Sequence, residues 1–314
     1  MTATLLQGEL TETNAATKDS ARAAEQWVHL NGSLVPKAAA SISIYDHGFL
    51  YGDGAFEGIR VYSGCIFQLV PHIERLYRSA HSLGFSLTRT PAQLQDDIVQ
   101  TVRANGLSSG YIRVSVSRGV GLGLDPRHID CTSTIIISTE QLRLYPEELY
   151  ERGLDVITAS TRVPPAVCID PQVKSLGRYV NNINAKMEAN RVGAGEALML
   201  NMEGNVAEAT GDNVFLIRKG VMVTPPTSQG ALPGITRAVA ISIAGEIGIP
   251  FHESVFNLYD VYNADEAFLT GTAAEVIPMV TCDGRTIGTG RQGELTRRII
   301  SEFRAKTTIE GVTA

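Results

Sequence analysis

Residues 162–182 read RVPPAVCIDPQVKSLGRYVNN, a proline-rich segment that leads through Lys174 into a predicted helix. The chain has only six lysines, and the other five have ordinary explanations in the N-terminal tail, in loops or on solvated helix faces: Lys18, Lys37, Lys186, Lys219 and Lys306. A lysine that attacks carbonyl groups must be partly desolvated, so that its neutral amine is accessible. Most isolated lysines are solvated surface residues. Lys174 is therefore a candidate nucleophile whose neighbours decide its role.

Length and composition describe an ordinary folded protein. The chain has 314 residues, of which 44% are hydrophobic and 19% are charged. This is about twice the usual domain length, with ample core to bury. We expect a mobile tail over residues 1–25, a small domain over 26–142 and a larger domain over 143–314. The seam between two packed domains is a common place for a ligand site.

Charge and cysteine usage exclude several classes of protein. The formal net charge is −6, and the Lys and Arg residues are scattered without runs, which argues against a nucleic-acid partner. No apolar stretch approaches the ~20 residues that span a bilayer, and the N-terminus lacks the pattern of a secretion signal. We expect a cytoplasmic protein without a membrane partner that acts on small molecules. The cysteines Cys65, Cys131, Cys168 and Cys282 are widely separated, which predicts buried thiols and no metal site.

Hydrophobic periodicity predicts an α+β protein. In the first part we expect two strands about an Asn-Gly turn within 27–36, a hairpin over 58–69, strands over 111–117 and 133–138, and helices over 72–83 and 91–105. In the second part we expect strands over 154–160, 196–201, 213–219, 221–224 and 266–270, with helices over 180–191, 236–247 and 293–306.

Two segments could bind a phosphate group, ALPGITR at 231–237 and TGTAAE at 270–275. Each is predicted to run from a loop into a helix, whose first backbone N–H groups favour an anion beside a Thr hydroxyl. A single segment of this kind is more often an ordinary helix cap, but two in one domain strengthen the phosphate interpretation. The chain has no Walker A sequence and no GxGxxG fingerprint. The Gly-rich segment GVGLGLDP at 119–126 is predicted to be a flexible loop.

Several blocks of sequence, in order and spacing, resemble the fold type IV pyridoxal-phosphate enzymes and in particular the branched-chain amino acid aminotransferases. They are YDHGFLYGDGAFEGIRVY (45–62), HIERLYRSA (72–80), YIR (111–113), VKSLGRYVNN (173–182), GNVAEATGDNVF (204–215), ALPGITR (231–237) and GTAAE (271–275). The resemblance covers nearly all of residues 27–303. It implies a two-domain α+β fold, with a small α/β N-terminal domain and a larger, β-barrel-like C-terminal domain that binds the cofactor and is surrounded by helices.

By position, the resemblance assigns the residues that bind pyridoxal 5'-phosphate. Lys174 is the lysine that bonds covalently to the cofactor aldehyde and then moves a proton between the substrate carbon and the cofactor. Glu208 is the carboxylate that faces the ring nitrogen and keeps it protonated. Tyr179 bonds the ring hydroxyl, and Leu232 packs against the ring. The residues expected at the phosphate group are Arg75, Gly234, Ile235, Thr236, Gly271 and Thr272.

The same resemblance implies transamination between branched-chain L-amino acids (Leu, Ile, Val) and 2-oxoglutarate. The pocket must then accept both an aliphatic side chain and the distal carboxylate of glutamate. Tyr51 and Phe56 fit an apolar wall, while Tyr51, Tyr111 and Arg113 fit a polar rim. The full set that carries over is Tyr51, Phe56, Gly58, Tyr111, Arg113, Thr272 and Ala273, of which the backbone of the last two is expected beside the α-carboxylate. A homodimer or a larger homo-oligomer is also expected.

Two departures from the family pattern leave substrate preference open. Arg178 stands where many members have a smaller polar residue, and the 119–126 loop differs in detail. A D-amino acid transaminase or an (R)-selective amine transaminase would keep Lys174, Glu208 and Arg75, although Arg113 favours the branched-chain type. Aminodeoxychorismate lyase would use the same cofactor without a keto-acid acceptor. A non-enzymatic binding module is disfavoured because Lys174 and Glu208 are both retained.

Overall fold

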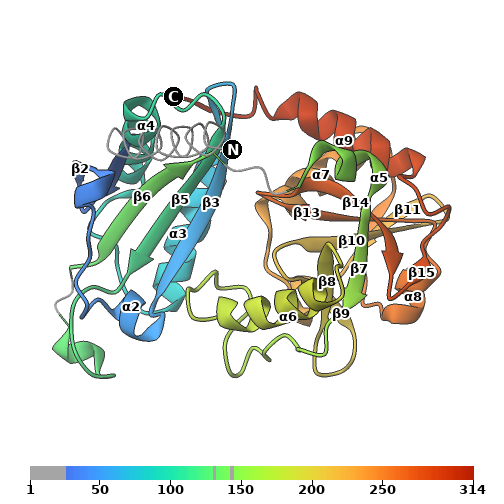
Figure 1. The fold of residues 1–314 in the computed structure, drawn as a ribbon, viewed down its shortest axis with the longest axis horizontal. Helices are drawn as coiled ribbons and strands as arrows, with labels where there is room; N and C mark the ends of the chain where they lie inside the picture. Colours follow the sequence, from blue (N-terminus) through green and yellow to red (C-terminus); the bar gives the residue numbers. More distant parts are fainter. Residues whose placement is uncertain (1–25, 130–131, 142–144) are drawn as a thin grey trace, which may run out of the picture.

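The computed structural model describes residues 26–129, 132–141 and 145–314. Two β-sheets form two halves of the molecule, and helices pack against each sheet (Figure 1). The fold is the predicted α+β type. The predicted tail over residues 1–25, Cys131 and part of the predicted connection between the halves lie outside the described residues.

The first sheet has seven strands in the order β16-β4-β3-β5-β6-β1-β2. Its strands are β1 (Trp27–Leu30), β2 (Ser33–Pro36), β3 (Gly54–Tyr62), β4 (Cys65–Phe67), β5 (Gly110–Ser117), β6 (Thr134–Glu140) and β16 (Gly311–Thr313). The Asn-Gly turn between β1 and β2 is confirmed: Asn31 and Gly32 both have positive φ, as the tight turn of a twisted hairpin requires.

Two helices, α3 (Leu69–Ser82) and α4 (Pro91–Ala104), cover this sheet. Leu69, Ile73, Leu76 and Ala80 recur on one side of α3 and are buried in the core beneath it. The hairpin predicted over 58–69 is confirmed as β3 and β4, but β3 begins four residues earlier, and Leu69 already belongs to α3. The turn of this hairpin, Ser63 and Gly64, again has positive φ at both residues.

The second sheet is larger and curls on itself (Figure 1). Its order is β12-β11-β10-β13-β14-β7-β8-β9, with β15 beside β14. Its strands are β7 (Leu154–Thr158), β8 (Glu196–Leu200), β9 (Val206–Ala209), β10 (Asn213–Arg218), β11 (Val221–Thr224), β12 (Phe251–Glu253), β13 (Glu266–Gly271), β14 (Glu275–Cys282) and β15 (Arg285–Thr286). The helices of this half are α5 (Glu147–Arg152), α6 (Tyr179–Arg191), α7 (Ile235–Glu246), α8 (Leu258–Tyr262) and α9 (Glu294–Lys306).

The last strand returns to the first half of the molecule. After α9, the chain crosses over, and β16 pairs with β4 of the first sheet (Figure 1). Residues 311–313 therefore complete a sheet built otherwise from residues before 142. The division of the chain into domains at residue 142 stays a prediction. The C-terminal end of the chain connects the second half to the first sheet.

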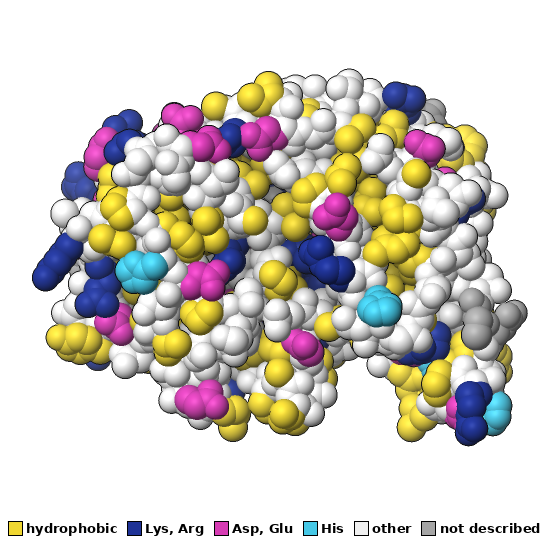
Figure 2. Space-filling model, turned by 180° about the vertical axis from the view of Figure 1, so that it is seen from behind, with side chains coloured by type: hydrophobic (Ala, Val, Ile, Leu, Met, Phe, Trp, Pro, Cys, Tyr) yellow, Lys and Arg dark blue, Asp and Glu magenta, His cyan; other side chains and the backbone are white. Residues whose placement is uncertain are grey.

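The two halves present a mixed surface on the face opposite to that of Figure 1. Figure 2 shows hydrophobic side chains on both halves and Lys or Arg side chains near the middle of this face. Several large hydrophobic residues are exposed on α2 (His47–Tyr51) and in the 119–124 loop, among them Phe49, Leu122 and Leu124. Cys168 is also exposed, so the prediction that the cysteines are buried is wrong for this residue, which lies in the loop before Lys174, while Cys65 and Cys282 are buried. Among the described residues, no helix is long and apolar enough to cross a membrane.

Candidate active site

Lys174 lies where the two halves meet. The segment 174–177 runs beside the start of β3: Phe56 N–H donates to the Lys174 carbonyl (3.1 Å), and Leu176 N–H donates to the Gly54 carbonyl (2.8 Å). The Lys174 N–H donates to Ser79 Oγ of α3 at 3.2 Å. The backbone of this lysine is therefore fixed by the first half, although α6, which follows it, packs on the second sheet.

The Lys174 amine points at two aromatic rings. Its Nζ donates to the Tyr179 hydroxyl at 2.9 Å and lies 4.6 Å from the centre of the Phe56 ring. The two rings meet edge to face, with centroids 4.8 Å apart. Tyr179 is the first residue of α6 and follows a turn over residues 176–178, which brings its side chain back to that of Lys174. The amine is partly buried, as the sequence predicted for a reactive lysine.

Glu208 is a buried carboxylate of β9, not a surface group. Its Oε2 accepts the Leu232 N–H at 2.7 Å, and its Oε1 accepts a hydrogen bond from the guanidinium of Arg178. Arg178 also donates to the Pro171 carbonyl. The sequence suggested only that Arg178 adjusts substrate preference, and its pairing with Glu208 was missed because ion pairs between distant segments leave no local pattern.

Arg75 of α3 is held in a fixed orientation by a buried carboxylate. Its Nε and Nη2 donate to the two oxygens of Glu57 (2.7 and 2.8 Å), and Nη1 donates to the Pro233 carbonyl at 2.9 Å. His72 Nδ1 lies 2.7 Å from Glu57 Oε2. Burial raises the pKa of Glu57, but Arg75 and then His72 outweigh it and lower that pKa to about 2. Burial lowers the pKa of His72.

The α7 helix begins at Ile235, two residues after Pro233. Gly234 is its N-cap residue and supplies no capping side chain, so the N–H groups of Ile235 and Thr236 open the helix as predicted. Gly234 packs against the side chain of Asn213: a Cβ there would lie 2.0 Å from Asn213 Oδ1. Asn213 in turn donates to the Leu232 carbonyl at 2.8 Å. A buried guanidinium beside an uncapped helix N-terminus is a donor set suited to a phosphate dianion.

The second predicted helix start, over 270–275, is wrong. Strands β13 and β14 pair antiparallel with Gly271 opposite Glu275, so Thr272, Ala273 and Ala274 form the turn of a hairpin. The alanines favour a helix locally, but pairing in the sheet overrides that preference. The turn still presents backbone N–H groups, and Glu275 reaches the first half, where its Oε1 accepts the Tyr62 hydroxyl at 2.9 Å.

Paired strands bring together most of the predicted substrate residues. Gly58 on β3 lies opposite Arg113 on β5. The Arg113 guanidinium lies over the Phe56 ring, 3.5 Å from its centroid. The Tyr111 hydroxyl covers Gly58, since a Cβ at Gly58 would lie 1.8 Å from it. Burial raises the pKa of Tyr111 and lowers that of Arg113. Tyr51 lies apart on α2, 44% exposed, with its ring against His47.

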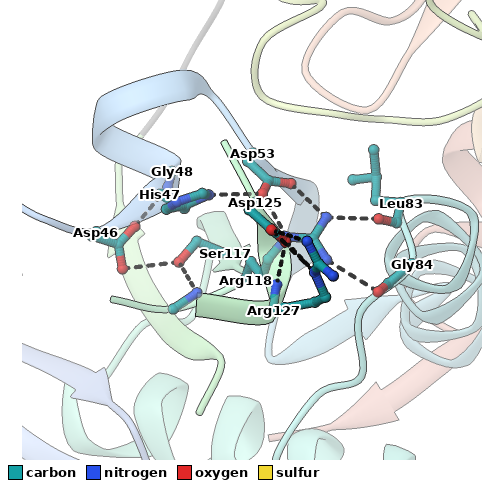
Figure 3. A network of polar contacts seen from close by, with 11 residues as sticks. Asp46, His47, Gly48, Asp53, Leu83, Gly84, Ser117, Arg118, Asp125 and Arg127 are labelled. Carbon is teal, nitrogen blue, oxygen red and sulfur yellow. Dashed lines mark hydrogen bonds and ion pairs between the residues drawn. The ribbon is translucent and has the colours of Figure 1, made fainter. Parts of the chain in front are cut away.

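A polar network fastens α2 to the ends of α3 and β5 (Figure 3). Asp46 caps the helix by accepting the Gly48 N–H at 2.8 Å and also accepts the Ser117 hydroxyl at 2.9 Å. Asp53 lies 3.0 Å from His47 Nδ1 and accepts from Arg118 at 2.6 and 3.1 Å. Arg118 continues to the carbonyls that end α3, at residues 83 and 84. The network places α2 and Tyr51 beside the segment 174–177.

A buried acid that the sequence did not single out lies in the same region. Asp212, between β9 and β10, meets Gly271, where a Cβ would lie 1.8 Å from its Oδ1. Burial and then the nearby carboxylate of Glu196 raise its pKa to about 8. Within the described parts of the chain, no cluster of three or more His, Cys, Asp or Glu residues could hold a metal ion.

The sequence of this chain is similar to those of known aminotransferases. The family model described as "Amino-transferase class IV" matches residues 54–282, so the protein is an aminotransferase of that class. A putative branched-chain-amino-acid aminotransferase of Methanocaldococcus jannaschii is 44% identical over 286 residues, which cover 91% of this chain and 98% of the relative. The chain therefore belongs to the branched-chain-amino-acid aminotransferase family within class IV.

Solved structures of this family have the same fold. The crystal structure of the Escherichia coli branched-chain amino acid aminotransferase has a TM-score of 0.88 and 33% identity, covering 92% of this chain and 96% of that one. A second solved branched-chain amino acid aminotransferase, complexed with N-(5'-phosphopyridoxyl)-L-glutamate, has a TM-score of 0.84 and 35% identity, covering 90% and 94%. The enzyme of Thermoproteus uzoniensis with norvaline also has a TM-score of 0.84, with 36% identity, covering 91% and 96%. The fold type IV assignment is confirmed.

Proposed function

We propose that the protein transfers the amino group of branched-chain L-amino acids (Leu, Ile, Val) to 2-oxoglutarate, giving branched-chain 2-oxo acids and L-glutamate. The observation that carries the proposal is the Lys174 amine, held between the Phe56 ring and the Tyr179 hydroxyl at the junction of the two halves. The family membership supports the reaction class. The relative solved with a phosphopyridoxyl-glutamate adduct supports both the cofactor and glutamate as a substrate.

The residues of the site fit pyridoxal 5'-phosphate. Arg75 and the uncapped start of α7 offer donors for its phosphate group, together with the hairpin turn at Gly271 and Thr272. Tyr179 would bond the ring hydroxyl, Leu232 would lie against the ring, and Glu208 would face the ring nitrogen. The full set proposed to hold the cofactor is Arg75, Lys174, Tyr179, Glu208, Leu232, Gly234, Ile235, Thr236, Gly271 and Thr272. When bound, the cofactor supplies an electron-withdrawing ring that stabilises negative charge at the substrate α-carbon.

Lys174 would hold the cofactor covalently and then move the proton at the substrate α-carbon. The amine can perform both tasks from one position, because the Lys174 backbone is hydrogen-bonded to the Phe56 N–H and to Ser79 Oγ. The Tyr179 hydroxyl, 2.9 Å away, orients the amine. The Phe56 ring lies over the amine, with 4.6 Å between Nζ and the ring centre.

The strands β3 and β5 would form the substrate pocket. Phe56 offers an apolar surface for a branched side chain, and the Arg113 guanidinium stacked on it, with the Tyr111 hydroxyl, offers donors for the distal carboxylate of glutamate. Gly58 leaves the space that the Tyr111 phenol occupies. Thr272 and Ala273 would bind the α-carboxylate through backbone N–H groups. The place of Tyr51 in the wall of the substrate pocket stays a prediction. A homodimer and a cytoplasmic location also stay predictions.

The decisive variant is Lys174→Ala, with Lys219→Ala as a control that removes an exposed lysine in the turn between β10 and β11. We expect the control to bind the cofactor covalently, as borohydride reduction and protein mass would detect, and to convert L-leucine with 2-oxoglutarate. Lys174→Ala should lose both the covalent binding of the cofactor and the conversion of L-leucine. A Lys174→Ala protein that still carries reducible cofactor and consumes L-leucine would refute the assignment.

The substrate assignment has its own test. We expect L-leucine, L-isoleucine and L-valine, but not D-alanine, to change the absorbance of the bound cofactor in single half-reactions. A response to D-alanine alone would contradict the L-specific proposal and favour a D-amino acid transaminase. Turnover without any keto-acid acceptor would favour a lyase.

A further inference from the structure

Among the described residues, Arg178 is the most deeply buried arginine, and the proposed reaction does not use it. Its side chain is 1% exposed, and its guanidinium donates to Glu208 and to the Pro171 carbonyl. It lies 5.4 Å from the centre of the Tyr179 ring. Burying an arginine is costly unless its charge is paired. The pairing with Glu208 therefore accounts for this burial, and it occurs at the carboxylate assigned to the ring nitrogen.

Both oxygens of Glu208 already have a donor from the protein. Oε1 receives the Arg178 guanidinium, and Oε2 receives the Leu232 N–H. The other charged groups around this carboxylate lie on neighbouring segments. Burial and then the carboxylate of Glu196 raise the pKa of Asp212 to about 8, which favours its neutral form. The positive charge of Lys174 acts in the opposite direction and lowers the pKa of Asp212. Arg178 is thus the cation in direct contact with Glu208 among the described residues.

We propose that Arg178 shares the Glu208 carboxylate with the ring nitrogen of the bound cofactor and thereby limits the protonation of that nitrogen. This inference rests on the proposed function, since it requires the ring nitrogen to face Glu208. A carboxylate beside the nitrogen favours the protonated ring, whereas a second cation on the same carboxylate disfavours it. Arg178 is a positioning residue in this scheme: it acts on the ring only through Glu208.

The pair also has a consequence for stability. Arg178 is the charge partner of Glu208 among the described residues. Without the arginine, Glu208 would stay buried and unpaired until a protonated ring nitrogen arrives. Cofactor binding should then stabilise the variant more than it stabilises the wild type, because binding would restore the missing partner.

The test compares Arg178→Met with Arg178→Lys in holoenzyme reconstituted with cofactor that carries ¹⁵N in the ring. The ¹⁵N chemical shift distinguishes a protonated from an unprotonated ring nitrogen and does not depend on activity. We expect Arg178→Met to raise the ratio of protonated to unprotonated nitrogen about tenfold at neutral pH, as for removal of a like charge a few ångströms away. Arg178→Lys keeps the charge and should stay near the wild-type ratio. Arg191→Met, at the exposed end of the same helix, is the matched control.

The outcomes separate this inference from the proposed function. Glu208→Gln should shift the nitrogen toward the unprotonated form, and no change there would refute the assignment of Glu208 itself. A shift in Glu208→Gln with none in Arg178→Met would refute only the role of Arg178. If Arg178→Met does not fold, Arg178→Gln decides, because the glutamine removes the charge but keeps an NH₂ donor for the Glu208 carboxylate. Arg178→Gln should be more protonated at the ring nitrogen than the wild type, and the wild-type signal would overturn the inference.

Discussion

Replacing Glu57 by glutamine tests the charge network that orients Arg75. The Glu57 carboxylate is 1% exposed and accepts two hydrogen bonds from Arg75, while His72 lies 2.7 Å from it. The glutamine side chain would keep the shape of the original but remove its charge. Arg75 would then be buried beside a neutral amide, whose NH₂ group cannot accept a hydrogen bond.

The magnitude follows from the pKa of Glu57. The ordinary value of 4.5 falls to about 2 in the folded protein. At 1.36 kcal/mol per pH unit, this lowering corresponds to roughly 3 kcal/mol of stability, which agrees with the ~3–5 kcal/mol cost of breaking a buried pair. Because the folded pKa is the lower one, this stability is present above pH 4.5 and is lost as the pH falls from 4.5 toward 2.

Thermal unfolding of the holoenzyme at neutral pH measures the loss. At roughly 2 °C per kcal/mol for a chain of this size, we expect Glu57→Gln to lower Tm by about 6 °C. The exposed Glu302→Gln of α9 is the control and should leave Tm within about 1 °C. Because Arg75 is also proposed to bind phosphate, the dissociation constant for the cofactor should rise in Glu57→Gln and not in the control.

A second measurement follows stability against pH. Between pH 5 and 3, the wild type should lose stability faster than Glu57→Gln, which no longer has this carboxyl group to protonate. The reasoning would be refuted if Glu57→Gln had the wild-type Tm at neutral pH and the same slope of stability in this pH range. In that case the carboxylate would not stabilise the fold through Arg75.

Three further substitutions test other parts of the structure. Asp53→Asn should lower stability by about 1–2 kcal/mol, since it breaks the two-point ion pair with Arg118 that fastens α2, and a denaturant titration would detect this loss. Gly271→Ala should weaken cofactor binding, measured by equilibrium dialysis, at least tenfold because its Cβ would overlap Asp212 Oδ1; unchanged binding would contradict the tight contact at this turn. Gly245→Ala meets open space in α7 and should raise stability by up to about 1 kcal/mol, as thermal unfolding would show.

The local sequence predicted the helices and turns that are stabilised by residues close to one another in the chain. The helix α4 begins at Pro91 behind a Thr90–Gln93 capping box, and it was predicted within one residue. The tight turn at Asn31 and Gly32 was likewise predicted, because both residues tolerate positive φ at low cost. Short strands such as β9, β12 and β16 were missed. The equally short β11 was predicted, so length alone does not explain these misses; β12 and β16 form only against partners far away in the chain.

The sequence by itself determined the α+β class and predicted Lys174 as the reactive lysine, because the spacing from Lys174 to Tyr179 and the motif around Glu208 are local. It could not determine how these segments meet. Only the tertiary structure placed the Lys174 backbone against Phe56, made 270–275 a hairpin turn, and set Arg178 against Glu208. The physical reason is the same in each case: strand pairing and buried charge pairs join segments far apart in the chain, and their free energy outweighs the conformational preference of any one residue.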